Sequence, residues 1–314
     1  MKKILIVGAG GQIGSELVTY LRGLYGNGNV VAADLRQSER LAADGPFEIL
    51  DALDAERYAE LIRKYGIDSI FNLAALLSAK GEANPTLAWK INIGALTNSL
   101  EVARQYNCAL FTPSSIGAFG GDFPRDNTPQ DTIMQPNTMY GVCKVTGELL
   151  SNYYHTRFGV DTRSVRFPGI ISNVTLPGGG TTDYAVEIYY AAVKGERFVC
   201  PVSSNVYMDM MYMPDALRAT VELMEADPAK LKHRNSFNIA SMSFTPEIIY
   251  AEIRKRLPEF EMVYDVDPVK EAIAESWPNK LDDTCAREEW GWKPQWDLSS
   301  MTDDMLRAVR AKNL

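Results

Sequence analysis

The sequence predicts an α/β fold with a doubly wound parallel sheet and a second, smaller and discontinuous domain. The first observation is an uninterrupted apolar run, residues 4–7, that feeds a glycine-rich turn and then a helical pattern. The second is that apolar runs and helical patterns go on alternating as far as residue 167. Continuous apolar strands are typical of a parallel sheet covered on both faces. Alternation of strands and helices is typical of βαβ units.

The turn after the first strand has the pattern of a Rossmann dinucleotide-binding loop. It reads GAGGQIG over residues 8–14, and an apolar helix face follows it. Gly8 is expected to allow the tight turn, and Gly14 to let helix and strand pack closely. Gly10 or Gly11 would let the backbone approach a pyrophosphate that sits on the helix N-terminus.

The second strand, residues 30–33, ends in Asp34, twenty residues past Gly14. A carboxylate there accepts hydrogen bonds from an adenosine ribose and repels a 2'-phosphate. The sequence therefore favours NAD over NADP, although Arg36 weakens that preference a little. A flexible glycine turn without a ligand is the alternative for the loop alone.

Three further strands are predicted at residues 47–50, 70–73 and 109–112. After the strand at 47–50, Asp54 is expected to cap a helix and Asp51 to contact the adenine of the cofactor. Small residues follow the fourth strand at 74–78, where a cofactor would pass, because ligands of such sheets bind outside the carboxyl ends of the strands. Pro85 opens a long helix that contains Asn92, and an asparagine inside a helix is usually solvated or merely tolerated.

Tyr140 and Lys144 lie four residues apart at the start of an amphipathic segment, residues 140–154. On a helix they share one face. A free phenol loses its proton only well above neutral pH, and a nearby cation favours the phenolate. The pair would thus make a general base for an alcohol proton. The alternative is a half-buried aromatic ring beside a solvated lysine.

The rest of the chain continues the alternation less regularly. A sixth strand is predicted at residues 162–167, helices at 215–226 and 245–257, and a strand at 236–240 that returns to the main sheet. Residues 177–185, PGGGTTDYA, form either a glycine-rich turn leading into a helix or a bare linker. The methionines of residues 208–213 are expected to fill a core rather than bind a soft metal.

Composition excludes several classes of protein. The chain has 314 residues and a net charge of -8, with no basic stripe of the kind that nucleic-acid binding needs. Its four cysteines are far apart and it has two histidines, so no metal site or disulfide framework is expected and the default compartment is the cytoplasm. No stretch approaches the length of a membrane span.

Together, the glycine turn, Asp34, Ser114-Ser115, Tyr140 and Lys144 resemble the extended short-chain dehydrogenase/reductase superfamily over the whole chain. The resemblance implies that Ser115 orients the substrate oxygen and that Tyr140 is the acid/base. Lys144 would hold the nicotinamide ribose, and an asparagine matching Asn92 often supports a proton relay. Phe119 departs from the tyrosine common at its position, but it keeps the aromatic packing.

In finer detail, the chain is similar to the short-chain type of L-threonine 3-dehydrogenase. The matching segments are 76–78, 138–141, 177–185, 211–213, 242–246, 276–278 and 282–283. The resemblance implies a homodimer built on the two long helices around Asn92 and Tyr140. It also implies an NAD-binding domain of residues 1–167 and 205–245 and a substrate-binding domain of residues 168–204 and 246–314.

These considerations give two sets of expected site residues. Those expected to bind NAD are Gly8, Gly10, Gly11, Gln12, Ile13, Gly14, Asp34, Leu35, Arg36, Asp51, Ala52, Leu53, Leu73, Ala74, Ala75, Asn92, Pro113, Ser114, Tyr140, Lys144, Phe167 and Ile170. Those expected to bind substrate are Ser78, Ser115, Tyr140, Gly180, Thr181, Thr182 and Trp277. The hydroxyls and N–H groups of the 180–182 turn suit a carboxylate at a helix start.

The expected reaction is oxidation of L-threonine to 2-amino-3-ketobutyrate with reduction of NAD. A nucleotide-sugar 4-epimerase or dehydratase with tightly held NAD is the alternative, as is an NAD-binding sensor without chemistry. The sensor is disfavoured because Ser115, Tyr140 and Lys144 are all present. The sugar-nucleotide enzyme is disfavoured because no cluster of basic side chains for a diphosphate lies beside the 177–185 turn.

Overall fold

The computed structural model describes residues 1–175, 178 and 180–312, and it divides into two compact units. Unit 1 comprises residues 1–118, 136–166 and 217–237, and unit 2 comprises residues 119–135, 167–216 and 238–314. Residues 119–135 thus group with the second unit by compactness. The predicted domains were defined by the ligand that each would bind, NAD or substrate, and not by compactness. That division stays a prediction.

Unit 1 is built on a six-stranded parallel sheet in the order β3-β2-β1-β4-β5-β7. Its strands are β1 Ile4–Val7, β2 Val30–Asp34, β3 Phe47–Ile49, β4 Ser69–Asn72, β5 Ala109–Phe111 and β7 Thr162–Arg163. The order runs outward from β1 in both directions, as in a doubly wound dinucleotide-binding sheet. The predicted fold class is confirmed.

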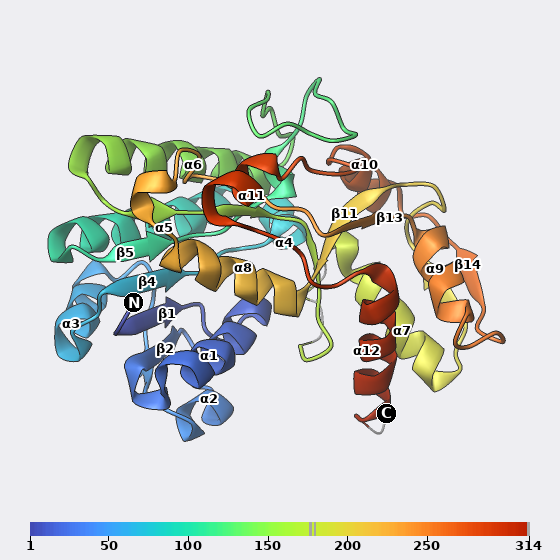
Figure 1. Ribbon diagram of the computed structural model, residues 1–314, viewed down its shortest axis with the longest axis horizontal. Helices are drawn as coiled ribbons and strands as arrows, with labels where there is room; N and C mark the ends of the chain where they lie inside the picture. Colours follow the sequence, from blue (N-terminus) through green and yellow to red (C-terminus); the bar gives the residue numbers. More distant parts are fainter. Residues whose placement is uncertain (176–177, 179, 313–314) are drawn as a thin grey trace. The chain divides into compact units, whose positions relative to one another are not determined.

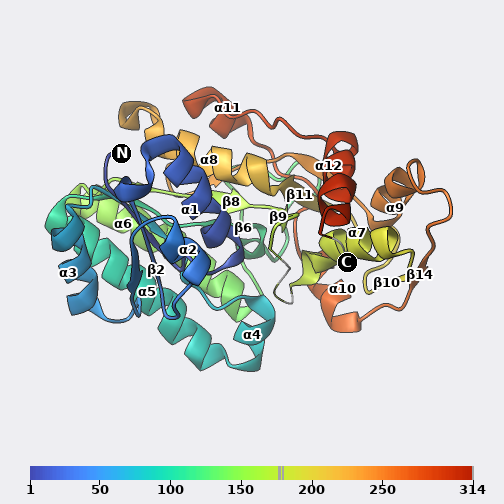
Figure 2. The same ribbon diagram turned by 90° about the horizontal axis from the view of Figure 1, so that it is seen from below.

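Helices lie on both faces of this sheet. They are α1 Gln12–Tyr25, α2 Glu39–Ala43, α3 Ala55–Tyr65, α4 Ser78–Ala83, α5 Pro85–Tyr106 and α6 Met139–Phe158. Leu5 and Val7 of β1 pack in one cluster with side chains of α3 and α5, such as Leu61 and Leu100. Because side chains alternate along a strand, Ile4 and Ile6 face the side of α1. Figures 1 and 2 show α1 and α5 on opposite sides of the strands.

The helix ends follow their local sequence. Asp54 caps α3 by accepting a hydrogen bond from the N–H of Arg57 at 3.0 Å, as predicted. Thr138 caps α6 in the same way, accepting from the N–H of Gly141 at 3.1 Å. Pro85 is the first residue of α5, and Asn84 before it accepts from the N–H of Leu87.

Two predictions about strands are wrong. Residues 162–167 form two short strands, β7 and β8 Val165–Phe167, that belong to different sheets. The strand predicted at 236–240 is β12 Phe237–Asn238, and it pairs in the separate sheet β12-β8-β6, in which β6 is Ser114–Ser115. The chain leaves the main sheet at Ser164, whose N–H donates to Arg234 O and whose carbonyl accepts from Phe237 N.

Unit 2 contains two small sheets. One has the order β13-β11-β9, with β13 Met242–Phe244, β11 Met208–Tyr212 and β9 Gly169–Ile171, and the other pairs β10 Phe198–Cys200 with β14 Met262–Tyr264. Its helices are α7 Tyr184–Lys194, α9 Pro246–Arg254, α10 Pro268–Glu275, α11 Thr284–Trp290 and α12 Leu298–Arg310. Helix α8 Met213–Glu225 starts in unit 2 and continues into unit 1.

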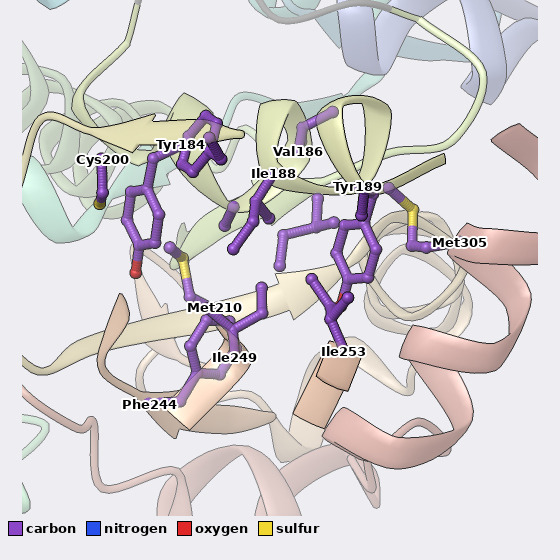
Figure 3. Close-up of a cluster of buried hydrophobic side chains, with 14 of the residues drawn as sticks. Tyr184, Val186, Ile188, Tyr189, Cys200, Met210, Phe244, Ile249, Ile253 and Met305 are labelled. Carbon is purple, nitrogen blue, oxygen red and sulfur yellow. The ribbon is translucent and has the colours of Figure 1, made fainter. Parts of the chain in front are cut away.

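The core of unit 2 gathers side chains from α7, α9, α12 and the two sheets. Figure 3 shows Tyr184 and Ile188 of α7 on the side of Met210 of β11, and Tyr189 of α7 beside Ile253 of α9. Every residue of β11 is buried, so its methionines fill the core as predicted. Among the helices that the structure describes, none is both long and apolar enough to cross a membrane.

Candidate functional site

The glycine turn brings α1 very close to the end of β1. Gly8 has φ +80°, a conformation that favours glycine, and the N–H groups of Gly8 and Ala9 both donate to Ala33 O at 3.0 Å. A Cβ on Gly14 would lie 2.2 Å from Gly8 O. The turn and the helix therefore fit together only because Gly14 has no side chain.

The start of α1 offers groups that suit a dinucleotide. Gly11 stands at its N-cap, and no described side chain accepts a hydrogen bond there, so the first N–H groups of α1 point outward. The Gln12 Nε2 atom is buried and has no hydrogen-bond partner among the described residues. Asp34 ends β2, and its Oδ2 accepts from Gly10 N at 2.8 Å. N–H donors and a carboxylate in this arrangement fit a pyrophosphate and a ribose.

The other residues predicted around the adenine lie at the same sheet edge. Leu35 is 65 % exposed directly after Asp34. Asp51 accepts from Leu53 N at 2.9 Å, which fixes the turn through Ala52. A Cβ on Gly8 would lie 2.8 Å from Ala74 N, so the loop after β4 touches the glycine turn.

Asn92 is neither solvated nor merely tolerated, so that expectation is wrong. Its Oδ1 accepts from Leu76 N at 2.7 Å and its Nδ2 donates to Leu76 O at 3.1 Å. Helix α5 thereby holds the loop of Leu73, Ala74 and Ala75 just before Ser78, the first residue of α4. No signal in the local sequence indicates this clamp, because the partner lies sixteen residues away.

Ser115, Tyr140 and Lys144 come together at the start of α6. The Tyr140 ring packs on Gly117, where a Cβ would lie 3.2 Å from two ring carbons. Ser115 Oγ accepts from Gly117 N at 3.1 Å. Lys144 Nζ donates to Pro113 O at 2.7 Å and lies 5.2 Å from the centroid of the Tyr140 ring. The predicted i, i+4 pair thus shares one face, with Ser115 beside it.

A partly open pocket of about 40 Å³ is lined by Lys144 and by six other residues predicted to bind NAD: Leu73, Ala74, Ala75, Asn92, Pro113 and Ser114. This volume holds one or two water molecules. Polar groups of Asn92, Ser114, Glu148 and Ser151 line it, and Ser151 Oγ is buried with no hydrogen-bond partner among the described residues. Cys143 also lines it, and burial raises the pKa of that thiol. The pocket therefore suits ordered water.

The 180–182 turn lies in unit 2, at the start of a helix as predicted. Thr181 and Thr182 form a short 3-10 turn, Thr181–Asp183, that leads directly into α7. Gly180 donates its N–H to Asp183 Oδ2 at 2.5 Å, so in this conformation that N–H serves the turn itself. Pro177 and Gly179 of the predicted turn lie outside the described residues.

The remaining predicted residues also lie in unit 2. Phe167 ends β8 and is buried, and Ile170 in the middle of β9 pairs with Met211. Trp277 is 8 % exposed, and its carbonyl accepts from Arg125 Nε at 3.0 Å. The side chain of Thr182 packs directly against Gly169, because a Cβ on Gly169 would lie 2.7 Å from Thr182 Cγ2.

Comparison with sequences of known families gives one match that covers most of the chain. The model of the NAD dependent epimerase/dehydratase family matches residues 4–240. A protein of Staphylococcus aureus strain MRSA252, described as an uncharacterized epimerase/dehydratase, is 56 % identical over 100 % of this chain and 98 % of its own length.

Comparison with solved structures gives high similarity over nearly the whole chain. The L-threonine dehydrogenase of Clostridium difficile has a TM-score of 0.98 and 55 % identity, covering 99 % of this chain and 98 % of that one. The holo form of a GalE-like L-threonine dehydrogenase from Cupriavidus necator has a TM-score of 0.96 and 50 % identity, covering 98 % and 99 %. A UDP-glucose 4-epimerase of Thermotoga maritima shares the fold at 22 % identity and a TM-score of 0.86.

Proposed function

This chain belongs to the NAD dependent epimerase/dehydratase family, and from that premise we propose that it oxidises L-threonine at C3 to 2-amino-3-ketobutyrate. NAD is the cofactor. The observation that carries the proposal is likeness to solved L-threonine dehydrogenases at 42 % to 55 % identity over at least 98 % of the chain. The grouping of Ser115, Tyr140 and Lys144 supports it independently, because a dehydrogenase needs a base beside the carbinol.

The chain's own residues bind the cofactor, orient the substrate and take its proton in this proposal. The N–H groups at the start of α1 bind the pyrophosphate, and Asp34 accepts from the adenosine ribose. Ser115 donates to the substrate oxygen and orients it. Tyr140 takes the hydroxyl proton, while Lys144 binds the nicotinamide ribose. NAD, when bound, accepts the hydride that leaves the same carbon.

We assign binding of the amino-acid part of the substrate to Ser78, Thr181, Thr182 and Trp277. L-Threonine carries a carboxylate and an ammonium beside the carbinol, so its site needs both donors and acceptors. The start of α7 suits the carboxylate, since helix N-termini attract anions. Gly180 contributes to the shape of that turn, because its N–H bonds to Asp183.

A nucleotide-sugar epimerase or dehydratase is the second candidate. The description of the Staphylococcus aureus relative and of the matching family favours it. The two candidates differ in redox outcome, because an epimerase returns its hydride to the sugar and leaves no net NADH.

The deciding experiment mixes the protein with NAD and one of three substrates: L-threonine, another 3-hydroxy acid or a UDP-sugar. Absorbance of reduced nicotinamide is followed, and sugar products are separated by chromatography. Threonine-dependent NADH with 2-amino-3-ketobutyrate, which loses CO2 to aminoacetone, supports the proposal. Epimerised sugar without net NADH would replace it with the second candidate.

We also propose that the chain forms a homodimer through α5 and α6. Large apolar side chains are exposed on these helices, among them Trp89 at 43 %, Leu149 at 63 % and Tyr153 at 55 %. Contiguous exposed apolar surface marks association sites. One similar structure, at 43 % identity, is described as a monomeric L-threonine 3-dehydrogenase, so the assembly has to be measured by light scattering.

A further inference from the structure

One face of α6 is attached at three points to the segment that carries Ser115. Tyr140, Lys144 and Glu148 are spaced four residues apart and so share this face. The Tyr140 ring packs on Gly117 and Lys144 Nζ donates to Pro113 O. At the third point, Ser114 Oγ donates to Glu148 Oε1 at 2.5 Å.

Glu148 is buried, and its charge is compensated. It is 4 % exposed, as is Arg166, whose Nε donates to Oε1 at 3.0 Å and whose Nη2 donates to Oε2 at 2.8 Å. A bidentate charged pair fixes direction as well as distance. Arg166 lies on β8, which pairs with β6, the strand of Ser114 and Ser115. Glu148 therefore joins α6 to β6 and β8, two of the three strands of this small sheet.

We propose that Glu148, with Arg166, is a positioning residue for the oxidation: through Ser114 it sets the register between α6 and β6. Tyr140 and Lys144 lie on α6 and Ser115 lies on β6, so this register decides the distance between the proposed base and the group that orients the substrate oxygen. The inference rests on the proposed function for the roles of those three residues. Glu148 itself does not touch substrate.

A purely structural role makes a different prediction. A buried ion pair often adds little to the stability of a protein. Removing one partner nevertheless destabilises the fold, because the other charge stays buried and unpaired. If Glu148 had only this structural role, variants that remain folded would have the kcat of the wild type. A shift of about 1 Å between catalytic groups, in contrast, costs about 100-fold in rate.

The test compares three variants of the full chain. Ser114→Ala removes the link to β6 and leaves the Glu148–Arg166 pair intact, and Glu148→Gln removes the charge. Glu252→Gln is the matched control, because Glu252 is 8 % exposed on α9 and pairs with Lys255 and Arg256, outside the proposed site. For each variant, the unfolding midpoint, kcat, KM for L-threonine and NAD affinity by calorimetry are measured below the unfolding range.

Ser114→Ala and Glu148→Gln are expected to lower kcat by about 10- to 100-fold with KM for L-threonine changed less than about threefold, because groups are misplaced rather than removed. Glu252→Gln is expected to lower stability and keep kcat. Folded Ser114→Ala and Glu148→Gln proteins that keep kcat within about twofold overturn the inference. If Glu148→Gln does not fold, Ser114→Ala decides alone.

The wild-type protein separates this inference from the proposed function. Without threonine-dependent NADH in the wild type, the proposed function fails, and NAD affinity then tests the positioning. Glu148→Gln should weaken NAD binding by about threefold or more, because Lys144 is displaced from Pro113, while Glu252→Gln should leave it unchanged. If the wild type, Glu148→Gln and Glu252→Gln bind NAD with equal affinity, the inference is overturned.

Discussion

The phenol of Tyr140 can be removed with little disturbance of its surroundings. Its ring packs on Gly117, and Phe keeps that contact. We expect Tyr140→Phe to lower kcat by about 100- to 10,000-fold, the range for a lost general base, with NAD affinity and unfolding midpoint retained. Steady-state kinetics and calorimetry check this. Tyr153→Phe is the control, because Tyr153 is 55 % exposed on the same helix. Substantial turnover in Tyr140→Phe would rule out the assignment.

Asp34 is expected to select NAD over NADP. Its carboxylate lies at the end of β2, where Oδ2 accepts from Gly10 N. Asp34→Ala removes both the ribose acceptor and the charge that repels a 2'-phosphate. We expect the ratio of kcat/KM for NADP to that for NAD to rise roughly 10- to 100-fold, the effect of one hydrogen bond to a charged group. Glu39→Ala, an exposed acid on α2, should leave the ratio unchanged. A wild type that uses both cofactors equally well would contradict the assignment.

At the level of single residues, the sequence predicted features that depend on spacing within one helix. It did not indicate contacts between residues that are far apart in the sequence. The faces of Tyr140 and Lys144 and the cap at Asp54 are set within four residues, so they were predictable. Glu148 lies on the same face, but its partner Arg166 lies eighteen residues away on another element. The Asn92 clamp was missed for the same reason.

The contact between the glycine turn and α1 leads to a prediction about that helix. Gly14→Ala would put a Cβ 2.2 Å from Gly8 O, so we expect it to lower the unfolding midpoint and to weaken NAD binding strongly. Gly23→Ala on the same helix meets nothing within 4 Å and should instead stabilise the protein by about 0.5 to 1 kcal/mol. Denaturant unfolding and NAD titration check both. Equal behaviour of the two variants would show that the helix can shift at no cost.

The elements of the main sheet were predictable because each is a local apolar run followed by a turn or a helix. The breaks in the second half were not. Ser164 separates β7 from β8. Its backbone forms hydrogen bonds with Arg234 and Phe237, which come about seventy residues later in the chain. The segment 162–167 carries no mark of that change in its sequence, since the residues of both strands are buried.

For the whole molecule, buried Asp209 predicts a dependence of stability on pH. Burial raises the pKa of Asp209 from 3.8 to about 8, with Asp283 adding to the rise and Lys280 opposing it. Because the folded pKa lies above the unfolded one, the folded state holds the proton more tightly, and stability is lost as pH rises from about 4 to about 8. The carboxyl stays attached to Leu281 N at 2.7 Å.

Asp209→Asn keeps an oxygen for Leu281 N and removes the charge. We expect it to be close to wild type in free energy of unfolding at about pH 4 and more stable by on the order of 2 to 5 kcal/mol at about pH 8.5. Urea unfolding across this range measures the difference. Asp265→Asn, at an exposed position, is the control and should give a difference that does not grow with pH. A constant difference for Asp209→Asn would mean that this carboxyl does not titrate in the window.

The interleaving of the two units has a consequence for synthesis on the ribosome. Unit 1 takes its last segment from residues 217–237, and unit 2 takes its last from residues 238–314. A nascent chain that has emerged only as far as residue 216 therefore holds the complete main sheet but lacks the rest of α8 and β12. Neither unit is whole at any earlier point, so no single cut yields an independent domain. Translation should therefore complete unit 1 first, after residue 237, and unit 2 only with residues 238–314, and until then each incomplete unit exposes apolar surface that favours aggregation.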